Sequence, residues 1–244
     1  SLDPSAGTLE DARFTGNFEF TDGPMRALSN DARYNVTAGT LALSGKEITP
    51  EIRDESLTLL AEGIDVTLEP RKMIAKGNVR STLLPPQKAA AGAAATKRPA
   101  LLGDKDPVNI LSTALSYDES SKKAEYTGQT RLFQGATSIN ADKLTLDETK
   151  GDLTATGKVV TNLEIANKQA GAGVKTRPTI GRAENFAYAD DTRMATYTTS
   201  AQFDGDQGHL SAGKLELQLE KTENALDKLE AIGAGTPPGG KHPA

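Results

Sequence analysis

A short pattern recurs along this chain and constrains its fold more than any other feature of the sequence. Residues 12–16 read ARFTG, residues 124–128 read AEYTG, and residues 195–199 form a looser copy, ATYTT. Two following segments also match, INADKLTL at 139–146 and LSAGKLEL at 210–217. Similar segments in the same order indicate one structural unit used several times, so the fold must be built from copies of it.

Apolar residues alternate with polar ones inside each unit, as at Ile64, Val66 and Leu68. Alternation of this kind predicts strands with one apolar face. Short polar segments separate the strands and read as hairpin tips, which predicts an all-β antiparallel sheet; they lie at 69–72, 118–123, 147–151, 190–193 and 220–224.

Two windows, 51–62 and 215–232, are rich in helix formers and compete with this interpretation. The repeat favours strands there, because LELQL at 215–219 aligns with the LTL of 144–146. One unit is not expected to change its period between copies. A continuous helix over 215–232 would contradict the prediction.

The composition excludes several classes of function. Five Tyr, six Phe and no Trp argue against a thick aromatic core, and a net charge of −5 argues against a nucleic-acid partner. The chain has no Cys and only two His, His209 and His242, which leaves almost no material for a metal site or a histidine-based triad. We therefore expect no metal and no cofactor.

The repeat extends over residues 1–233, with insertions at about 84–107 and 167–180 and a disordered Gly/Pro tail at 234–244. Prolines at 85, 86 and 99 predict a mobile loop in preference to a helix for the Ala-rich first insertion. The chain starts at Ser1 without Met, from which we expect a signal peptide or membrane anchor upstream.

The best copy of the unit resembles a known family. The strings AEYTG at 124–128, RLFQG at 131–135 and GDLTATGKV at 151–159 resemble the OstA-like domain of the periplasmic lipopolysaccharide-transport proteins, LptA and its relatives. The strong match covers about 40 residues, and weaker copies cover most of 12–233. The bridge protein LptA, the anchored LptC, a fusion of the two and the periplasmic part of LptD all remain open.

The resemblance implies a β-jelly roll folded like a half-open taco, whose apolar inside receives the acyl chains of lipid A. It also implies a protein without catalytic activity, located in the periplasm. Such domains align end to end and bridge the inner and outer membranes. Partners would be lipopolysaccharide, other proteins of the bridge and further copies of the chain.

The residues themselves support a groove. Taken as a set, small residues such as Ala75, Gly77 and Ala155 near a closing sheet would leave space between two walls, although each one alone is better explained by strand bends and close packing. Ile139 and Leu144 differ in parity, so both can point inward only if a bulge lies near residues 141–142. We predict that the groove is lined by Leu68, Met73, Val79, Leu132, Ile139, Leu144, Leu146, Leu153, Val159, Leu215 and Leu217.

Charged residues and strand edges give two further predictions. Arg131, Lys158, Lys72 and Lys76, at or near strand ends, could meet lipid phosphates, or could simply be solvated charges that protect the sheet. The first strand, around 12–20, and the last, around 226–232, are the candidate edges for β-augmentation by another sheet.

Other classes of function find less support. Residues 120–123 match S-x-x-K but fall in a hairpin tip, and Asp204 with Asp206 supplies too few oxygens for calcium. The alternative is a structural or adhesive β-solenoid, or a carbohydrate-binding β-sandwich. The absence of Trp leaves few platforms for stacking a sugar, and the spacing of the units is uneven for a solenoid.

Overall fold

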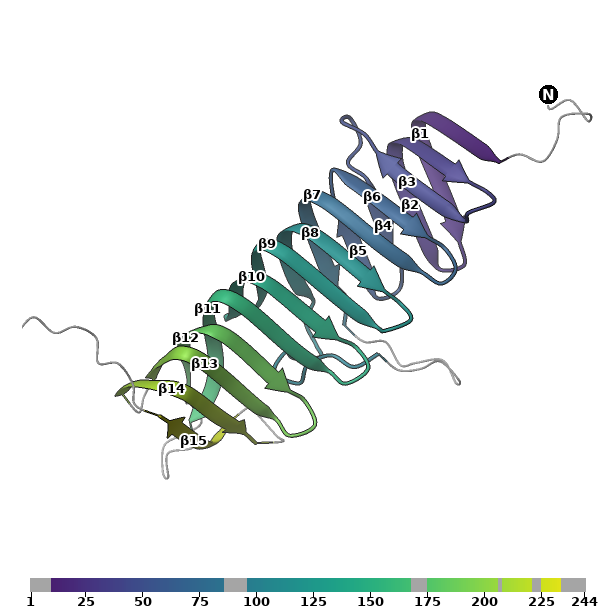
Figure 1. The fold of residues 1–244 in the computed structure, drawn as a ribbon. Coiled ribbons are helices and arrows are strands. Elements are labelled where there is room, and N and C mark those ends of the chain that lie inside the picture. Colours follow the sequence, from purple (N-terminus) through teal and green to yellow (C-terminus); the bar gives the residue numbers. More distant parts are fainter. Residues whose placement is uncertain (1–9, 86–95, 168–174, 206–207, 221–224, 234–244) are drawn as a thin grey trace, which may run out of the picture.

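The computed structural model describes residues 10–85, 96–167, 175–205, 208–220 and 225–233. Within these ranges it contains strands and turns and no α-helix (Figure 1). The fifteen strands are β1 (Asp11–Asp22), β2 (Met25–Asn35), β3 (Thr40–Ser44), β4 (Glu51–Arg53), β5 (Leu57–Leu60), β6 (Gly63–Thr67), β7 (Lys72–Leu83), β8 (Val108–Asp118), β9 (Lys123–Gln134), β10 (Thr137–Asp147), β11 (Asp152–Asn167), β12 (Lys175–Ala189), β13 (Met194–Gly205), β14 (Gly208–Leu219) and β15 (Leu226–Ile232).

All strands belong to one sheet, and every pairing among the described strands is antiparallel. From β7 to β15 each strand pairs with its neighbours in the chain. Near the N-terminus β2 pairs with β3 along one half and with β4 along the other. The all-β prediction is confirmed, and both disputed windows form strands, β4–β5 and β14–β15.

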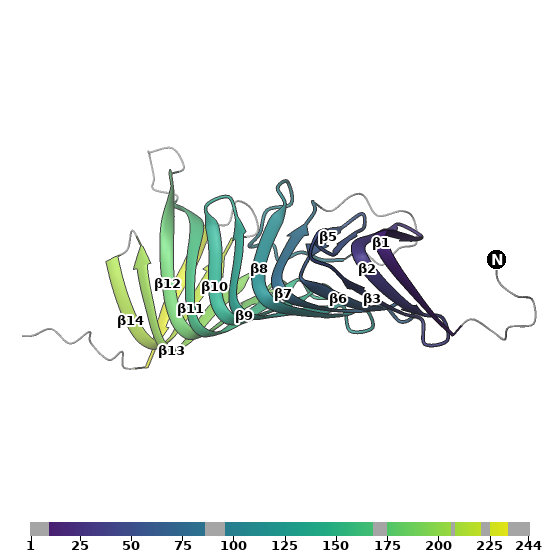
Figure 2. The ribbon, with the colours of Figure 1, turned by 90° about the horizontal axis from the view of Figure 1, so that it is seen from above.

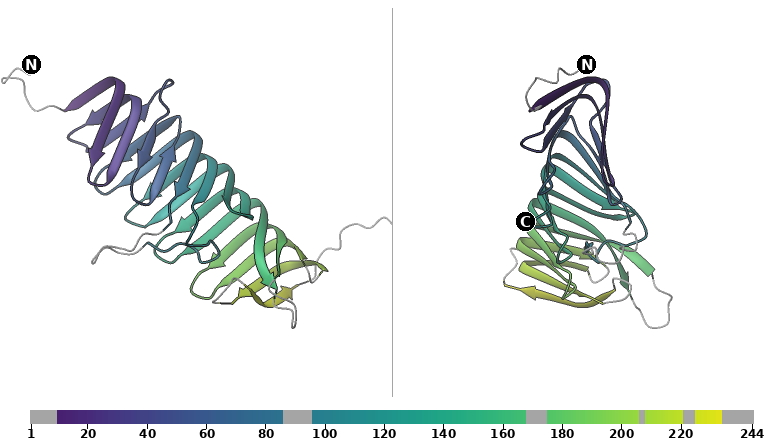
Figure 3. Two further views of the ribbon diagram at one scale, coloured as in Figure 1. Left: turned by 180° about the vertical axis from the view of Figure 1, so that it is seen from behind. Right: turned by 90° about the vertical axis from the view of Figure 1, so that its right-hand side faces the viewer.

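The sheet is folded lengthwise into two walls. Figure 2 shows the strands curving from one wall into the other, and the right panel of Figure 3 shows the walls diverging from their common fold. We call residues 72–76, 114–118, 123–127, 143–147, 152–156, 185–189, 194–198 and 214–219 the first wall. The second wall comprises 79–83, 108–111, 130–134, 137–141, 159–163, 180–182, 201–205 and 208–212. The predicted half-open taco is confirmed.

The fold between the walls is a line of β-bulges, which we call the crease. The pairing register shifts midway along the strands, for example between Ala141 and Lys143, so the bulge predicted from the parity of Ile139 and Leu144 is confirmed. A bulge bends its strand and increases the local twist. Bulges at the same height in successive strands therefore fold the whole sheet along one line.

The recurring glycine of the sequence motif lies in the crease. Gly128 and the next residue, Gln129, both have positive φ angles, +80° and +49°. A Cβ on Gly128 would come within 2.5 Å of Thr113 Oγ1 on the neighbouring strand, so both conformation and space favour glycine. The looser third copy reaches the same geometry with Thr199 and Ser200, at +67° and +55°.

The core lies between the walls, and it contains aromatic rings. Tyr126, Tyr188, Tyr197 and Phe186 are the largest fully buried side chains. These rings are few beside the Leu, Ile, Val and Ala side chains that make up most of the core, which agrees with the expectation that the core is not thickly aromatic. Phe186 and Tyr197 contact each other with ring centroids 4.8 Å apart.

The two predicted insertions differ from expectation. Residues 86–95, which hold most of the Ala-rich stretch, lie outside the described part, whereas Leu101 and Leu102 later in the first insertion are buried in the core. Residues 175–180 of the second insertion are part of β12. The predicted tail, 234–244, lies outside the described residues. No helix in the described ranges could cross a membrane.

Candidate functional site

The predicted lining residues converge between the two walls. Ten of the eleven are buried and belong to one apolar cluster, and Leu68 is partly buried against it. Met73 and Leu144 come from the first wall, and Val79 and Ile139 face them from the second. The alternation read from the sequence thus identified inward-facing positions on both walls.

The walls touch each other in this structure, which differs from the open groove that we expected. Tyr197 on the first wall and Thr161 on the second share a buried hydrogen bond of 2.7 Å between their hydroxyl groups. A Cβ on Gly181 of the second wall would lie only 2.4 Å from the Tyr197 ring. The missing side chain of Gly181 therefore makes room for the Tyr197 ring, and the ring fills the space between the walls at this point.

The walls end in two rims that enclose the mouth of the folded sheet. We call the turns at 69–71, 119–122, 148–151 and 190–193 the first rim, and the turns at 54–56 and 135–136 with the strand ends at Leu83 and Val108 the second rim. An ion pair crosses the mouth near β5, where Arg71 Nη1 of the first rim lies 3.7 Å from Asp54 Oδ2 of the second.

Residues 96–107, which we call the strap, connect both rims. On the first rim, the Lys97 amide donates to the Glu148 carbonyl at 2.7 Å, and the Ala100 amide donates to Asp190 Oδ1 at 2.8 Å. At the end of β9, next to the second rim, Gln134 Oε1 accepts a hydrogen bond of 2.7 Å from the Gly103 amide. The strap therefore contacts the first rim through Lys97 and Ala100 and reaches the second rim again at Gly103.

Arg98 holds the strap in place. Its guanidinium donates to the carbonyl oxygens of Leu83 and Leu84 on the second rim and to those of Gly103 and Asp106 within the strap, at 2.6–3.2 Å. Burial lowers the pKa of Arg98, which Asp104 partly offsets. One side chain thus joins both ends of the strap to Leu83 and Leu84. Gln134 Nε2 also donates to the carbonyls of Gly103 and Asp106, each at 2.8 Å.

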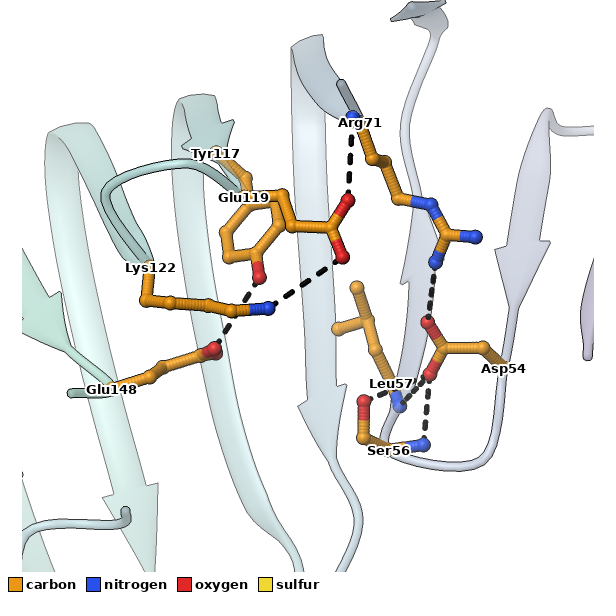
Figure 4. A network of polar contacts seen from close by, with 8 residues as sticks. All are labelled: Asp54, Ser56, Leu57, Arg71, Tyr117, Glu119, Lys122 and Glu148. Atoms are coloured by element: carbon orange, nitrogen blue, oxygen red, sulfur yellow. Dashed lines mark hydrogen bonds and ion pairs between the residues drawn. The ribbon is translucent and has the colours of Figure 1, made fainter. Parts of the chain in front are cut away.

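A cavity of about 230 Å³ lies beside the strap, between the two rims. Part of its polar lining forms the network of Figure 4, whose residues lie mostly on turns of both rims. Tyr117 donates a hydrogen bond of 3.3 Å to Glu148 Oε2, while Lys122 Nζ lies 3.5 Å from Glu119 Oε1. The Arg71 amide donates to Glu119 Oε2 at 3.3 Å.

Burial dominates the titration of this network. Burial raises the pKa of Glu148, against the opposing effects of the Tyr117 hydrogen bond and Lys122. Burial also raises the pKa of Tyr117, and the nearby Glu148 carboxylate adds to the increase. Both groups therefore favour their neutral forms more than they would in water.

The four predicted phosphate contacts do not form a common site. All are exposed on the outer faces of β7, β9 and β11. Lys76 and Lys158 lie next to the crease in mid-strand, so their prediction near strand ends was wrong, since the strands continue through the bulge. Lys72 pairs with Asp118 at 3.1 Å, and Arg131 lies over the Phe133 ring at 5.4 Å.

The predicted edge strands are edges of the sheet. Among the strands that the structure describes, β1 pairs only with β2 and β15 only with β14. Beside β1 the rings of Phe14, Phe18, Phe20 and Tyr34 follow one another at centroid distances of 5.0–6.5 Å, with Phe14 42% exposed. β15 is shorter and carries charges, among them the ion pair between Lys228 and Glu230.

The remaining sequence motifs occupy turns or surface ion pairs. Ser120 lies in the turn between β8 and β9, where its amide donates to Asp118 Oδ1. Asp204 is engaged by Arg182 and His209, at 2.8 and 2.6 Å. The described ranges contain no group of three or more His, Cys, Asp or Glu side chains placed to hold a metal.

Comparison with known proteins identifies the main part of the folded sheet. Residues 109–223 match the family described as "LptA/(LptD N-terminal domain) LPS transport protein". These residues form an OstA-like domain. The resemblance found in the sequence is confirmed, and the OstA-like domain contains both walls from β8 to β14 together with the line of bulges between them.

Among the solved structures that are similar to this chain is LptH, the LptA homologous periplasmic component of the conserved lipopolysaccharide transport device from Pseudomonas aeruginosa. The TM-score is 0.44 and the identity 15%, over 64% of this chain and 92% of that chain. No curated protein matches this chain.

Several residues of the OstA-like domain and the mouth were missed in the sequence. Leu115 and Tyr126 line the cavity from β8 and β9, and each lies in an alternating run that would have revealed it. No local sequence pattern predicts the ion pair between Arg71 and Asp54, because the two residues come together only when the sheet folds.

Proposed function

We propose that this chain is a periplasmic lipopolysaccharide-transport protein that shields acyl chains between its two walls. The main support is the continuous layer of buried apolar side chains on the inner faces of both walls. Much of this layer belongs to residues 109–223, which match a lipopolysaccharide-transport family. A buried methylene contributes roughly 0.8 kcal/mol, so an apolar interior of this extent offers a strong driving force for hiding acyl chains from water.

Loading requires the walls to part, because side chains fill the space between them. Most contacts to be exchanged are apolar, and an acyl chain replaces such contacts with contacts of the same kind. Tyr197 and Thr161 form a polar exception, since parting there breaks a buried hydrogen bond. A nearly balanced exchange suits a carrier, because very tight binding would stop the lipid from moving on.

Assembly into a bridge between the inner and outer membranes would use the free edges. β1 offers an unpaired edge of twelve residues beside partly exposed Phe rings, and such an edge can accept a strand from another sheet. β15 offers the second edge for head-to-tail association with another copy or another bridge protein.

A proline substitution in β1 tests this assembly. If the proline replaces a residue whose amide points away from β2, association should be blocked while the monomer stays folded.

The β-solenoid alternative receives no support from the pairing pattern, because a parallel β-helix stacks its coils and the described strands pair antiparallel. The carbohydrate-binding alternative would need an exposed aromatic platform on an outer wall. Within the described ranges, Phe133 is half-buried beneath Arg131, and the exposed Phe14 lies on β1, outside the two walls. We therefore advance one function for this chain.

A photocrosslinking experiment tests the proposal. A photoreactive residue at Leu144 or Leu215, both fully buried and inward-facing, should form adducts with lipopolysaccharide. The same residue at Thr145 or Lys143, on the outer side of β10, provides the matched control. Labelling of the outer positions without labelling of the inner ones would refute the proposal.

A further inference from the structure

The outer face of the second wall carries positive charge without negative charge over several strands. Each strand from β7 to β12 places one residue on the same outward row near the crease. We call these residues the arginine row: Arg80, Leu111, Arg131, Asn140, Val160 and Arg182. The next outward row, which runs from Thr82 on β7 to Ile180 on β12, has no charged residue. Three arginines therefore share these two rows with no carboxylate.

The outer face of the first wall is different. There, lysines pair with carboxylates of neighbouring strands, as Lys123 does with Asp147 at 3.7 Å and Lys143 with Glu125 at 2.7 Å. The whole chain has 33 Asp and Glu against 28 Lys and Arg, so a face without acids does not simply reflect the composition. The two outer faces therefore differ in their capacity to attract an acidic partner.

Two arginines of the row keep their charge available. Among the described residues, Arg80 and Arg131 form no ion pair, whereas Arg182 pairs with Asp204 of β13 at 2.8 Å. Arg131 lies over the ring of Phe133, 5.4 Å from its centroid, and this contact orients the guanidinium. A guanidinium that is already oriented loses less conformational entropy when it binds a carboxylate.

An exposed leucine lies between these two arginines. Leu111 on β8 is paired with Arg80 of β7 on one side and with Arg131 of β9 on the other, and it is 39% exposed. Protein interfaces are enriched in Arg and aromatic residues and depleted of Asp and Glu relative to the rest of the surface. The part of the row on β7, β8 and β9 has this composition.

We propose that the arginine row, centred on Leu111, is the docking surface for a partner protein that presents carboxylates around an apolar centre. Arginine can donate two parallel hydrogen bonds to one carboxylate, and the partner would cover Leu111 between two such contacts. A membrane surface fits less well, because recognition of anionic lipids relies on clusters of roughly four to eight basic residues. This surface lies outside the wall, so the inference goes beyond the proposed function and does not depend on it.

A fluorescein-labelled peptide of glutamate and leucine, ELEELEELE, provides a probe, with fluorescence anisotropy as the measurement. The unmodified chain should bind it about tenfold or more tightly than the matched glutamine peptide, QLQQLQQLQ. Arg131→Glu should weaken binding of the acidic peptide by about tenfold, since it reverses a charge next to Leu111. Lys123→Glu makes the same kind of charge change on the same strand but on the first wall, and should leave binding unchanged.

A second pair of variants tests the apolar centre. Leu111→Ser removes the exposed leucine and should weaken binding of the acidic peptide by about fivefold. Ile74→Ser is the control, because Ile74 is 44% exposed on the outer face of the first wall. Thermal unfolding midpoints show which variants are folded, and Arg131→Gln replaces Arg131→Glu if the latter does not fold.

Any of three results would overturn the inference: equal affinity for the two peptides, equal effects of Arg131→Glu and Lys123→Glu, or equal effects of Leu111→Ser and Ile74→Ser. Sedimentation with vesicles of phosphatidylcholine and phosphatidylglycerol tests the other occupant. If the chain sediments with these vesicles through Arg131 and does not bind the acidic peptide, the surface is a lipid site and the inference is wrong. Photocrosslinking of lipopolysaccharide at Leu215 should be the same in Arg131→Glu as in the unmodified chain, so this inference and the proposed function can fail separately.

Discussion

Tyr197 and Thr161 lie on opposite walls of the folded sheet, and their hydroxyl oxygens are 2.7 Å apart. Both residues are fully buried. Burial raises the pKa of Tyr197, so its hydroxyl stays protonated and can donate. This hydrogen bond joins β13 to β11 across the interior rather than along the sheet. It can form only while the two walls are in contact at this point.

Tyr197→Phe should lower the free energy of unfolding by about 1–3 kcal/mol, because it leaves the Thr161 hydroxyl buried without this partner. The double variant Tyr197→Phe with Thr161→Val removes both polar groups and should recover most of the loss. Urea denaturation of the single and double variants measures the difference. A double variant less stable than either single one would contradict this account.

Gly128→Ala should destabilise the crease by roughly 2 kcal/mol or more, because the new Cβ meets Thr113 and the backbone keeps a positive φ. Gly135→Ala is the control, since Gly135 also has a positive φ but an added Cβ there would find no neighbouring atom within 4 Å. It should lose only about 1 kcal/mol. Equal losses in urea denaturation would show that the contact with Thr113 is unimportant.

Arg98→Met should release the strap and lower the free energy of unfolding by roughly 2 kcal/mol, since hydrogen bonds from a charged donor to carbonyls on β7 are lost. Thermolysin should then cleave within residues 96–107 faster than in the unmodified chain. Arg131→Met, which removes an exposed guanidinium from β9, serves as the control. Unchanged cleavage of Arg98→Met would show that the strap is held by its other contacts.

Glu148 should make the chain less stable as pH rises. Burial raises its pKa in the folded state, so the folded protein holds the proton more tightly than the unfolded chain does. Stability from this group is present below the unfolded pKa and is lost as pH rises through the folded pKa. Glu148→Gln stays neutral and should therefore gain stability relative to the unmodified chain between about pH 4 and about pH 7.5.

Urea denaturation at the two pH values measures this gain, with Glu55→Gln on the exposed 54–56 turn as the control for removing one negative charge. The same difference between Glu148→Gln and the unmodified chain at both pH values would mean that Glu148 contributes no pH dependence.

Tethering the rims should block loading. The chain has no Cys, so Asp54→Cys with Arg71→Cys can be joined specifically across the mouth by a bis-maleimide containing a disulfide. If the walls must part, the tethered protein should bind lipopolysaccharide about tenfold or more weakly, and reduction should restore binding. A tether between Ser120→Cys and Thr149→Cys, both on the first rim, is the control. Equal binding by both tethered proteins would contradict parting at the mouth.

Local patterns in the sequence predicted the strands, the hairpin tips and the bulge at residues 141–142. Each depends on neighbours in the chain: alternation reveals the inward face, and the differing parity of Ile139 and Leu144 requires a bulge between them. The recurring glycine marked the unit, and the structure adds that this glycine bends the sheet.

Contacts between the walls could not be predicted in the same way. The approach of Tyr197 to Thr161, or of Arg71 to Asp54, depends on how the sheet closes, which no local pattern specifies. The packing of the strap against the core was not predicted either, because the Ala-rich stretch before it predicts only a loop, and Leu101 and Leu102, which anchor the strap in the core, follow that stretch.

From β7 to β14, every strand carries its own bend and, among the described strands, pairs only with the strands directly before and after it, apart from the pairing of β7 with β5. The cross-section of the molecule is consequently independent of how many hairpins it contains. Duplicating a hairpin would add length at constant width, so an ancestor of this chain could have adjusted its reach without redesigning its interior.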